Sequence, residues 1–460
     1  MAPLLALSLY CIFAVTALSI ERKANPEPTG ALWIPLLWIL VAASKPVGTW
    51  FGTAGGDDGS VLDQYLGIAL LAAGLLVLAN RPFSLWGALG SNAWLLALLL
   101  WMALSVSWSD MPDTAFKRWG REVVAVVMAC VVASEPQPKQ ALEAIFRRLA
   151  YLLIPASLVL IKYFPDLGVQ YRAMGGQMWI GATLQKNGLG RLCLIGTFFL
   201  IWALVRTWRS RRLPAIRRQR RADYFVLSLA LFLLLGPGDQ YSATALAAFG
   251  VGMTAYLWLL WKHRRGALPA RWLLVSTVAA FVVVGTMQPF NEGAAVHSVA
   301  DDLGRDATLT GRVEIWAGLS DVVSRQPFFG SGVSSFWTNE RRQTHQIGEA
   351  HNGYLEVVLA LGFVGLALTA MFVLASCAKA RRAMAVDFDW GCLWYCLLLM
   401  ATVHNITESS FNSFTTHLMA TLVFLTFVVR GDNVSPVPAG HPADDDAPCG
   451  TLPSGQHGTA

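Results

Sequence analysis

Long apolar runs recur along almost the whole chain, and they constrain its fold more than any other feature. A helix needs about 20 mostly apolar residues to cross the ~30 Å hydrocarbon core of a bilayer. About thirteen segments approach this requirement, several of them short. They centre on Leu4–Ile20, Ala31–Ala43, Leu66–Leu78, Ala93–Val106, Val123–Val132, Leu149–Ile161, Leu192–Leu204, Phe225–Leu235, Ala243–Leu260, Leu273–Val284, Leu355–Ala375, Gly391–Val403 and Leu418–Val429. The pattern predicts an all-α polytopic membrane protein with about 12–13 transmembrane helices.

Composition agrees with this prediction, because only 14% of the 460 residues are charged and 55% are hydrophobic. The charged fraction of an average soluble domain is about a quarter. Leu4–Ile20 has the length of a signal peptide, but it lacks a positive segment before its apolar core and a clear cleavage site after it. We therefore interpret it as a retained helix.

Basic residues gather in the loops between certain apolar runs. Four loops predicted to lie inside carry Arg206, Arg209, Arg211, Arg212, Arg217, Arg218, Arg220 and Arg221; Lys262, Arg264 and Arg265; Lys379, Arg381 and Arg382; and Lys139, Arg147 and Arg148. The positive-inside rule places all four on the cytoplasmic side, which puts the N-terminus outside and the C-terminus inside. The net charge of +6 therefore reports orientation, and we expect no nucleic-acid partner.

This topology divides the chain into two parts. Residues 1–430 are the predicted transmembrane helical domain, and they include a large outward loop at residues 289–350. Residues 431–460 are rich in Pro, Gly and Asp without an apolar period, which is typical of a disordered tail.

Neither metal nor disulfide chemistry is evident in the spacing of possible ligands. The seven cysteines lie mostly inside apolar runs, with no paired spacing on a polar loop. His297 and His345 are isolated, and Asp301, Asp302 and Asp306 do not follow a calcium-loop spacing. We expect a site without metal or cofactor.

Positive residues on the predicted outward loops need an explanation, because the positive-inside rule disfavours them there. They are Lys117, Arg118, Arg121, Arg172, Lys186, Arg191, Arg305, Arg312 and Arg325. Each alone is explained equally well by a solvated or snorkelling side chain. Together, with arginine preferred for bidentate phosphate contact, they predict an outward site for a large anion.

Arg312 is the most informative of these residues. Thr310 is a plausible N-cap, and the following apolar residues predict an amphipathic helix that lies at the membrane surface. These residues recur at helical spacing, at Val313, Trp316, Leu319 and Val323. An arginine in a first turn opposes the helix dipole unless an anion binds there. The alternative is a side chain that turns into solvent.

The outward loop from Lys162 to Arg191 is rich in glycine, which allows close approach of the backbone to a ligand. Arg172 and Lys186 supply positive charge within it. No established phosphate motif is present, so a re-entrant or simple connecting loop remains an equal alternative.

His351 precedes the apolar run Leu355–Ala375. The positive end of a helix favours neutral imidazole, which suits a general base for a hydroxyl nucleophile. The alternative is a polar residue at the membrane boundary. Glu349 is near enough in sequence to orient His351, whereas Glu356 lies off its helix face and should point into the bundle.

Six stretches resemble the O-antigen ligase and polymerase superfamily of bacterial inner membranes, including its exopolysaccharide-polymerising branch. They are SVSWSDMPDTAFKRW at Ser105–Trp119, GATLQKNGLG at Gly181–Gly190, Ser242 with Thr244, GRVEIW at Gly311–Trp316, PFFGSGVSSF at Pro327–Phe336 and HNGYLEVVLALGFVG at His351–Gly365. The resemblance covers roughly residues 105–429 in the expected order, and the last three stretches are together fairly specific.

The resemblance implies a multi-pass glycosyltransferase of the polyprenyl-phosphate-sugar-using architecture in the bacterial inner membrane. Its donor would be a glycan on undecaprenyl pyrophosphate, and its acceptor a hydroxyl of a glycan or lipid-linked sugar. Arg312 and Arg172 would hold the pyrophosphate, and His351 would activate or orient the acceptor. Lys186 and Asn187 would line the donor site. Further predicted substrate contacts are Arg118, Arg121 and Glu356.

A transporter or flippase of lipid-linked glycans is the rival from another class. It should place ionisable residues near the bilayer midplane on broken helices. Here most candidate residues gather at one predicted face, with Glu356 the main exception. A non-catalytic assembly partner is the third alternative. The sequence does not identify the acceptor, so it does not distinguish a ligase from a polymerase.

Overall fold

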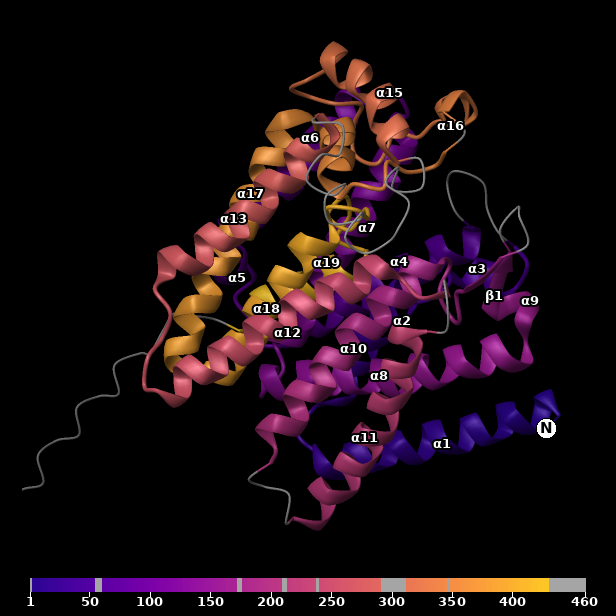
Figure 1. Cartoon of the computed structure of the whole chain (residues 1–460), viewed down its shortest axis with the longest axis vertical. Helices are drawn as coiled ribbons and strands as arrows, with labels where there is room; N and C mark the ends of the chain where they lie inside the picture. The colour runs from indigo at the N-terminus through magenta and orange to yellow at the C-terminus, as the bar shows by residue number, and fades with distance from the viewer. Residues whose placement is uncertain are drawn as a thin grey trace, which may run out of the picture.

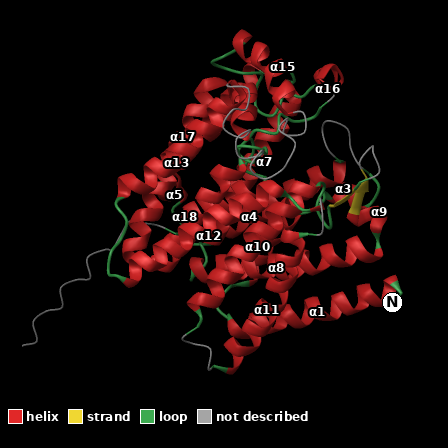
Figure 2. Ribbon diagram, in the orientation of Figure 1, coloured by secondary structure: helices red, strands yellow, loops and turns green. Residues whose placement is uncertain are grey.

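The structure, a computed structural model, is almost entirely helical (Figures 1 and 2). It describes residues 2–53, 60–171, 176–208, 213–236, 240–290, 312–345 and 347–429, without the side chains of residues 312–314. The principal helices are α1 (Pro3–Ala24), α2 (Trp33–Ala42), α3 (Val47–Trp50), α4 (Val61–Ala79), α5 (Leu85–Gly90), α6 (Ala93–Ser105), α7 (Pro112–Ala133), α8 (Pro138–Tyr163), α9 (Pro165–Gly168), α10 (Lys186–Arg206), α11 (Pro214–Leu235), α12 (Ala243–Arg264), α13 (Arg271–Met287), α15 (Arg312–Arg325), α16 (Asn339–His345), α17 (Gly353–Val386), α18 (Phe388–His404) and α19 (His417–Val428).

Each apolar segment predicted from the sequence lies in one of these helices. Among the described residues, seven helices are long and apolar enough to cross a bilayer: α1, α4, α8, α10, α12, α13 and α17. Three shorter apolar helical segments cover Gly30–Ala42, Ala93–Trp108 and His417–Val428. The remaining predicted segments lie in α7, α11 and α18. The prediction of a polytopic, mostly helical membrane protein is confirmed.

The helices differ in how they use their apolar surface. Almost every residue of α18 and α19 is buried, so these two helices are apolar all round and form the centre of the bundle. By contrast, α1 and α4 bury few residues and expose leucines along their length. In a membrane protein such exposed apolar side chains face the lipid.

Polar contacts join segments that the sequence places on the same side. On the predicted inner side, Arg148 pairs with Glu21, at 2.7 Å between Nε and Oε2. On the predicted outer side, Arg118 donates a hydrogen bond to the carbonyl of Ser334, and the hydroxyls of Thr244 and Thr407 lie 2.8 Å apart. The contacts agree with the predicted grouping of loops, while the orientation itself stays a prediction.

Helix α17 is broken at Gly362, where φ is +68°. The segment Pro327–Ser331 supplies hydrogen bonds at the break: the Pro327 carbonyl accepts from Phe363 N at 2.8 Å, and Ser331 N donates to the Leu359 carbonyl at 3.0 Å. A Cβ at Gly362 would come within 2.0 Å of the Phe328 carbonyl oxygen. The PFFGS stretch is therefore fixed to the helix break, and the first part of α17 is a separate short helix.

Helices α15 and α16 project beyond the bundle at the end where α17 begins (Figure 1, top). The predicted helix after Arg312 is confirmed as α15, and its apolar face packs on the protein, while its place at the membrane surface stays a prediction. Trp316 and Leu319 are buried in the protein, and the Trp316 Nε1 donates to the Ala350 carbonyl at 2.8 Å. The apolar face of α15 packs on the protein because the start of α17 and the residues Gln288–Phe290 cover it.

The glycine-rich connection between α8 and α10 forms α9 and an antiparallel hairpin of β1 (Val169–Tyr171) and β2 (Gln177–Trp179). The buried Lys45, which lies between α2 and α3, holds this connection in place. Its amine donates to the carbonyls of Leu167 and Gly181, the latter at 3.3 Å. Residues 172–175, and with them Arg172, lie outside the described residues.

Candidate functional site

The HNG sequence at residues 351–353 fixes the start of α17 against the end of α18. Asn352 caps α17, because its Oδ1 accepts from Tyr354 N at 3.0 Å and Leu355 N at 2.9 Å. Gly353 N donates to the Asn405 carbonyl at 2.9 Å. A Cβ on Gly353 would come within 1.8 Å of Asn405 Oδ1, so only glycine allows this approach.

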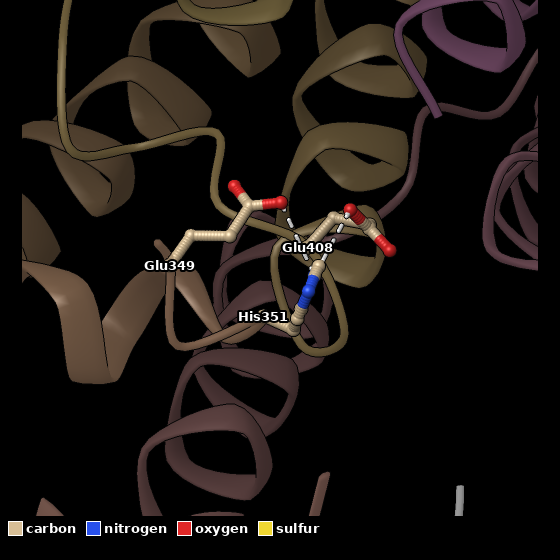
Figure 3. A group of neighbouring side chains, drawn as sticks. All are labelled: Glu349, His351 and Glu408. Carbon is tan, nitrogen blue, oxygen red and sulfur yellow. Dashed lines mark ion pairs between the residues drawn. The ribbon is translucent and has the colours of Figure 1, made fainter. Parts of the chain in front are cut away.

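His351 lies directly before this cap, between two carboxylates (Figure 3). Its Nδ1 is 3.3 Å from Glu349 Oε1 and 3.9 Å from Glu408 Oε2. Its backbone has φ of +50°, a conformation that few residues other than glycine adopt. Such local strain, of order 1–3 kcal/mol, is characteristic of functional sites. The side chain is 29% exposed, so it is accessible from outside the bundle.

Glu408 comes from the turn between α18 and α19 and is almost fully buried. Asn187, in the first turn of α10, donates from Nδ2 to Glu408 Oε1 at 2.5 Å. The turn is itself held by Asn405, whose Oδ1 accepts from Ser410 N at 2.9 Å and Phe411 N at 3.0 Å. The structure therefore joins Asn187 to the His351 cluster through Glu408.

Arg191 follows Asn187 by one turn on the same face of α10. Its Nη1 donates to the Ser409 carbonyl at 3.3 Å and to Ser410 Oγ at 3.5 Å. These acceptors are neutral, so they satisfy the guanidinium without cancelling its charge. The nearby carboxylates of Glu408 and Glu349 act on it electrostatically.

The sequence prediction missed Glu408 and did not select Arg191 from the outward cations. Glu408 is far from His351 along the chain, and no spacing rule connects the two. The available signal was the polar run Thr407–Ser410 between two apolar segments. Glu349 was considered as a partner of His351, and the structure places the two side chains in contact.

Glu356, a predicted substrate contact, has hydrogen-bond partners within the protein, and its contact with substrate stays a prediction. It is buried as expected, but its two oxygens accept from Trp337 Nε1 at 3.1 and 3.0 Å. Oε1 also accepts from Ala350 N. The carboxylate therefore holds the backbone directly before His351.

Three further predicted residues lie on two helices. Lys186 begins α10, next to Asn187. Arg118 and the exposed Arg121 lie on α7, where Arg118 contacts the loop at Ser334.

The structure describes one of the other two predicted arginines only in part and the other not at all. Arg312 is the first residue of α15, and its side chain lies outside the described residues, as do Arg172 and Thr310 entirely. Trp316, one turn along α15, bonds the backbone one residue before His351. Helix α15 is therefore anchored beside the cluster, and the direction of the Arg312 side chain stays a prediction.

Glu349, His351 and Glu408 also form a set of metal-ligand types. One ligand atom from each lies within 4.8 Å of the others. Imidazole nitrogen with carboxylate oxygen suits Zn²⁺ and similar ions. Sequence spacing does not reveal this set, because Glu408 joins it only in the folded chain. The expectation of a metal-free site is therefore one that chelation must test.

Comparison with known proteins places the chain in a definite context. The family model described as O-antigen ligase matches residues 225–370, which include α15 and His351. The chain is 24% identical to the O-antigen ligase of Pseudomonas aeruginosa over 393 residues, 82% of this chain and 83% of that protein. It is 23% identical to the exopolysaccharide production protein ExoQ of Rhizobium meliloti over 320 residues, 66% of this chain and 68% of ExoQ. The predicted resemblance is confirmed.

Proposed function

We propose that this membrane protein of the O-antigen ligase family, a participant in polysaccharide biosynthesis, transfers a glycan from undecaprenyl pyrophosphate to a sugar hydroxyl. The reaction would take place on the periplasmic side of the bacterial inner membrane. One observation carries the proposal: a strained, partly exposed histidine stands between two carboxylates at the start of a short helix.

His351 has the surroundings of a general base. A carboxylate beside Nδ1 favours the tautomer with the proton on Nδ1, which makes Nε2 the proton acceptor. When the imidazole takes a proton from the acceptor hydroxyl, Glu349 and Glu408 stabilise the imidazolium. The hydroxyl oxygen attacks the anomeric carbon of the donor as the bond to pyrophosphate breaks. The atoms balance without a cofactor.

The leaving group carries away the electron pair of the broken bond, so negative charge grows on undecaprenyl pyrophosphate. Outward cations stabilise this charge most if they are already in place. Arg312 and Arg172 are proposed to bind it, with Arg191 and Lys186 adding positive potential. Arg191 suits this role because its described hydrogen bonds go to neutral oxygens.

One observation supports the alternative of a transporter, namely the break in helix α17. However, the backbone at Gly362 is bonded to Pro327–Ser331, so those groups are already engaged within the protein. The described polar groups of the candidate site lie at the start of α17 and α10 rather than at this break. We therefore favour transfer over transport.

The test is reconstitution of the purified protein with a short undecaprenyl-pyrophosphate oligosaccharide. Released undecaprenyl pyrophosphate is measured for wild type, Arg312→Ala and His351→Ala, each shown to be folded by thermal unfolding. We expect release only with an acceptor present, and a loss of about 100-fold or more in both variants. The acceptor that works distinguishes a ligase from a polymerase.

Transport of the intact lipid-linked sugar would contradict the proposal, provided that both variants move it as fast as wild type. The same preparation, with the donor enclosed in vesicles, measures this directly.

A further inference from the structure

A cleft of about 520 Å³ lies where the segment after α15 meets the end of the α6 region. None of its lining residues takes part in the proposed reaction. We name it the aromatic cleft, and it is lined by Trp108, Arg325, Gln326, Pro327, Phe328, Phe329 and Gly330.

The rings of Trp108 and Phe329 line the aromatic cleft, and the ring of Trp101 packs against Phe329. The rings of Trp108 and Phe329 meet edge to face, with centroids 5.5 Å apart, and Trp101 stacks against Phe329 at 5.7 Å. Trp108 Nε1 donates to the Phe329 carbonyl at 3.3 Å. Phe329 is nevertheless 54% exposed and its neighbour Phe328 62% exposed. The rings are thus held in fixed positions while much of their surface remains uncovered.

The cleft also has a polar lining. Arg325 and Gln326 are exposed, and among the residues that the structure describes Arg325 makes no hydrogen bond or ion pair. The cleft continues into a second cavity of about 310 Å³, which shares Arg325, Gln326 and Gly330 and adds Ser331 and Arg341. Polar donors therefore extend along this side.

The aromatic rings and the polar lining together discriminate between ligand classes. A polyprenyl chain gains from the rings but would bury the Arg325 guanidinium without a partner, which is unfavourable. A pyranose ring has an apolar C–H face for the aromatic rings and hydroxyl acceptors for Arg325 and Gln326. We infer that the aromatic cleft is a saccharide subsite.

The position of the cleft indicates which part of a glycan it binds. Helix α15 has 14 residues, from Arg312 to Arg325, and so separates the backbones of these two arginines by about 20 Å. A sugar in the cleft is thus several units away from the bond that reacts near Arg312. Binding energy from such a remote sugar positions the reacting end. This step rests on the proposed function, and both the donor glycan and the acceptor glycan have the required chemistry.

Direct binding tests the inference without turnover. The protein in lipid nanodiscs is titrated with the oligosaccharide that mild acid releases from the source bacterium's undecaprenyl-linked glycan, and separately with farnesyl phosphate. Saturation-transfer NMR reports each affinity for wild type, Phe329→Ala and Arg325→Ala. The matched control is Phe116→Ala, an aromatic that is 60% exposed on α7 but does not line the cleft.

We expect both cleft variants to bind the oligosaccharide about threefold to tenfold more weakly and farnesyl phosphate as wild type does. The control should bind both probes normally. Unchanged oligosaccharide affinity in Arg325→Ala, an exposed position that does not affect folding, would overturn the inference. So would a loss of farnesyl phosphate alone, since that result identifies a lipid groove.

His351→Ala separates this inference from the proposed function. It should bind the oligosaccharide normally while releasing no undecaprenyl pyrophosphate. If wild type binds the sugar through the cleft and never transfers it, the proposed function fails and the subsite remains. If transfer occurs, a raised KM for donor or for acceptor in Arg325→Ala identifies which glycan the cleft holds.

Discussion

Two arginines at the predicted inner end of the helical bundle and two at the predicted outer end differ in their partners. At the predicted inner end, Arg147 pairs with both Asp223 and Glu143, at 3.1 Å in each case, and Arg206 pairs with Glu143 at 2.7 Å. At the predicted outer end, Arg191 bonds a carbonyl and a hydroxyl, and Arg325 has no partner among the described residues.

The difference in partners indicates what the charge of each of these arginines does. A carboxylate partner cancels the charge of an arginine, so the inner pairs hold helices together and leave little potential for a ligand. A carbonyl or hydroxyl partner fixes the guanidinium in place but leaves its charge for an anion. Arg147 and Arg206 thus act as structural clamps, whereas Arg191 keeps its charge for an anion and Arg325 keeps its donors for a sugar.

The largest expected effect comes from breaking an inner clamp. Arg147→Leu leaves Asp223 buried without its cation, although Tyr151 still donates a hydrogen bond to it at 2.6 Å. We expect a loss of about 3–5 kcal/mol in unfolding free energy. Thermal unfolding in detergent measures this, with the partly exposed Arg206→Gln as the control that should cost less than about 1 kcal/mol. Equal melting temperatures for Arg147→Leu and wild type would contradict the structural role.

The outer carboxylates should affect rate rather than stability. Glu408→Gln keeps the shape of the side chain that Asn187 contacts but removes the charge near His351. We expect kcat to fall about 10–100-fold with little change in melting temperature. An unchanged kcat would remove Glu408 from the mechanism.

Lys45 gives a smaller, pH-dependent effect at the outer end. Burial lowers the pKa of its amine, so the unfolded chain binds this proton more tightly than the folded chain does. Unfolding free energy should therefore rise as pH increases through the range between the folded and unfolded pKa values. Lys45→Met should flatten this rise in chemical unfolding curves recorded from neutral to alkaline pH. A rise of the same steepness in the variant would show that another group causes it.

Chelation should have the smallest effect of all. If Glu349 and Glu408 serve His351 as carboxylates rather than as metal ligands, incubation with EDTA leaves the rate of transfer unchanged. Loss of activity in EDTA with recovery on adding Zn²⁺ or Mn²⁺ would instead assign the three residues to a metal site.

The sequence predicts the helices well and the site only in part, for a physical reason. Each apolar run lies in a helix, because length and hydropathy determine what a bilayer accepts. The break at Gly362 is not readable from LALGFVG, since the run stays apolar while the partner segment Pro327–Ser331 comes from elsewhere. Similarly, His351 is visible next to a helix start, but its contact with Glu408 depends on how α17 and α18 pack.

The prediction for α15 shows the same limit. Its helical period is evident from Trp316 and Leu319, yet a period cannot say whether lipid or protein covers the apolar face. The structure covers it with protein, through contacts such as the bond from Trp316 to Ala350. The local sequence pattern therefore predicts the helix, and only the tertiary structure shows what the helix packs against.

The most direct test of the difference between the two ends is the affinity for undecaprenyl pyrophosphate itself. Binding to the protein in nanodiscs is measured for wild type, Arg312→Gln at the outer end and Arg206→Gln at the inner end. We predict about tenfold weaker binding for Arg312→Gln, as expected for loss of one charged hydrogen bond, and wild-type binding for Arg206→Gln. Equal affinities in all three proteins, or a loss confined to Arg206→Gln, would contradict an outward pyrophosphate site.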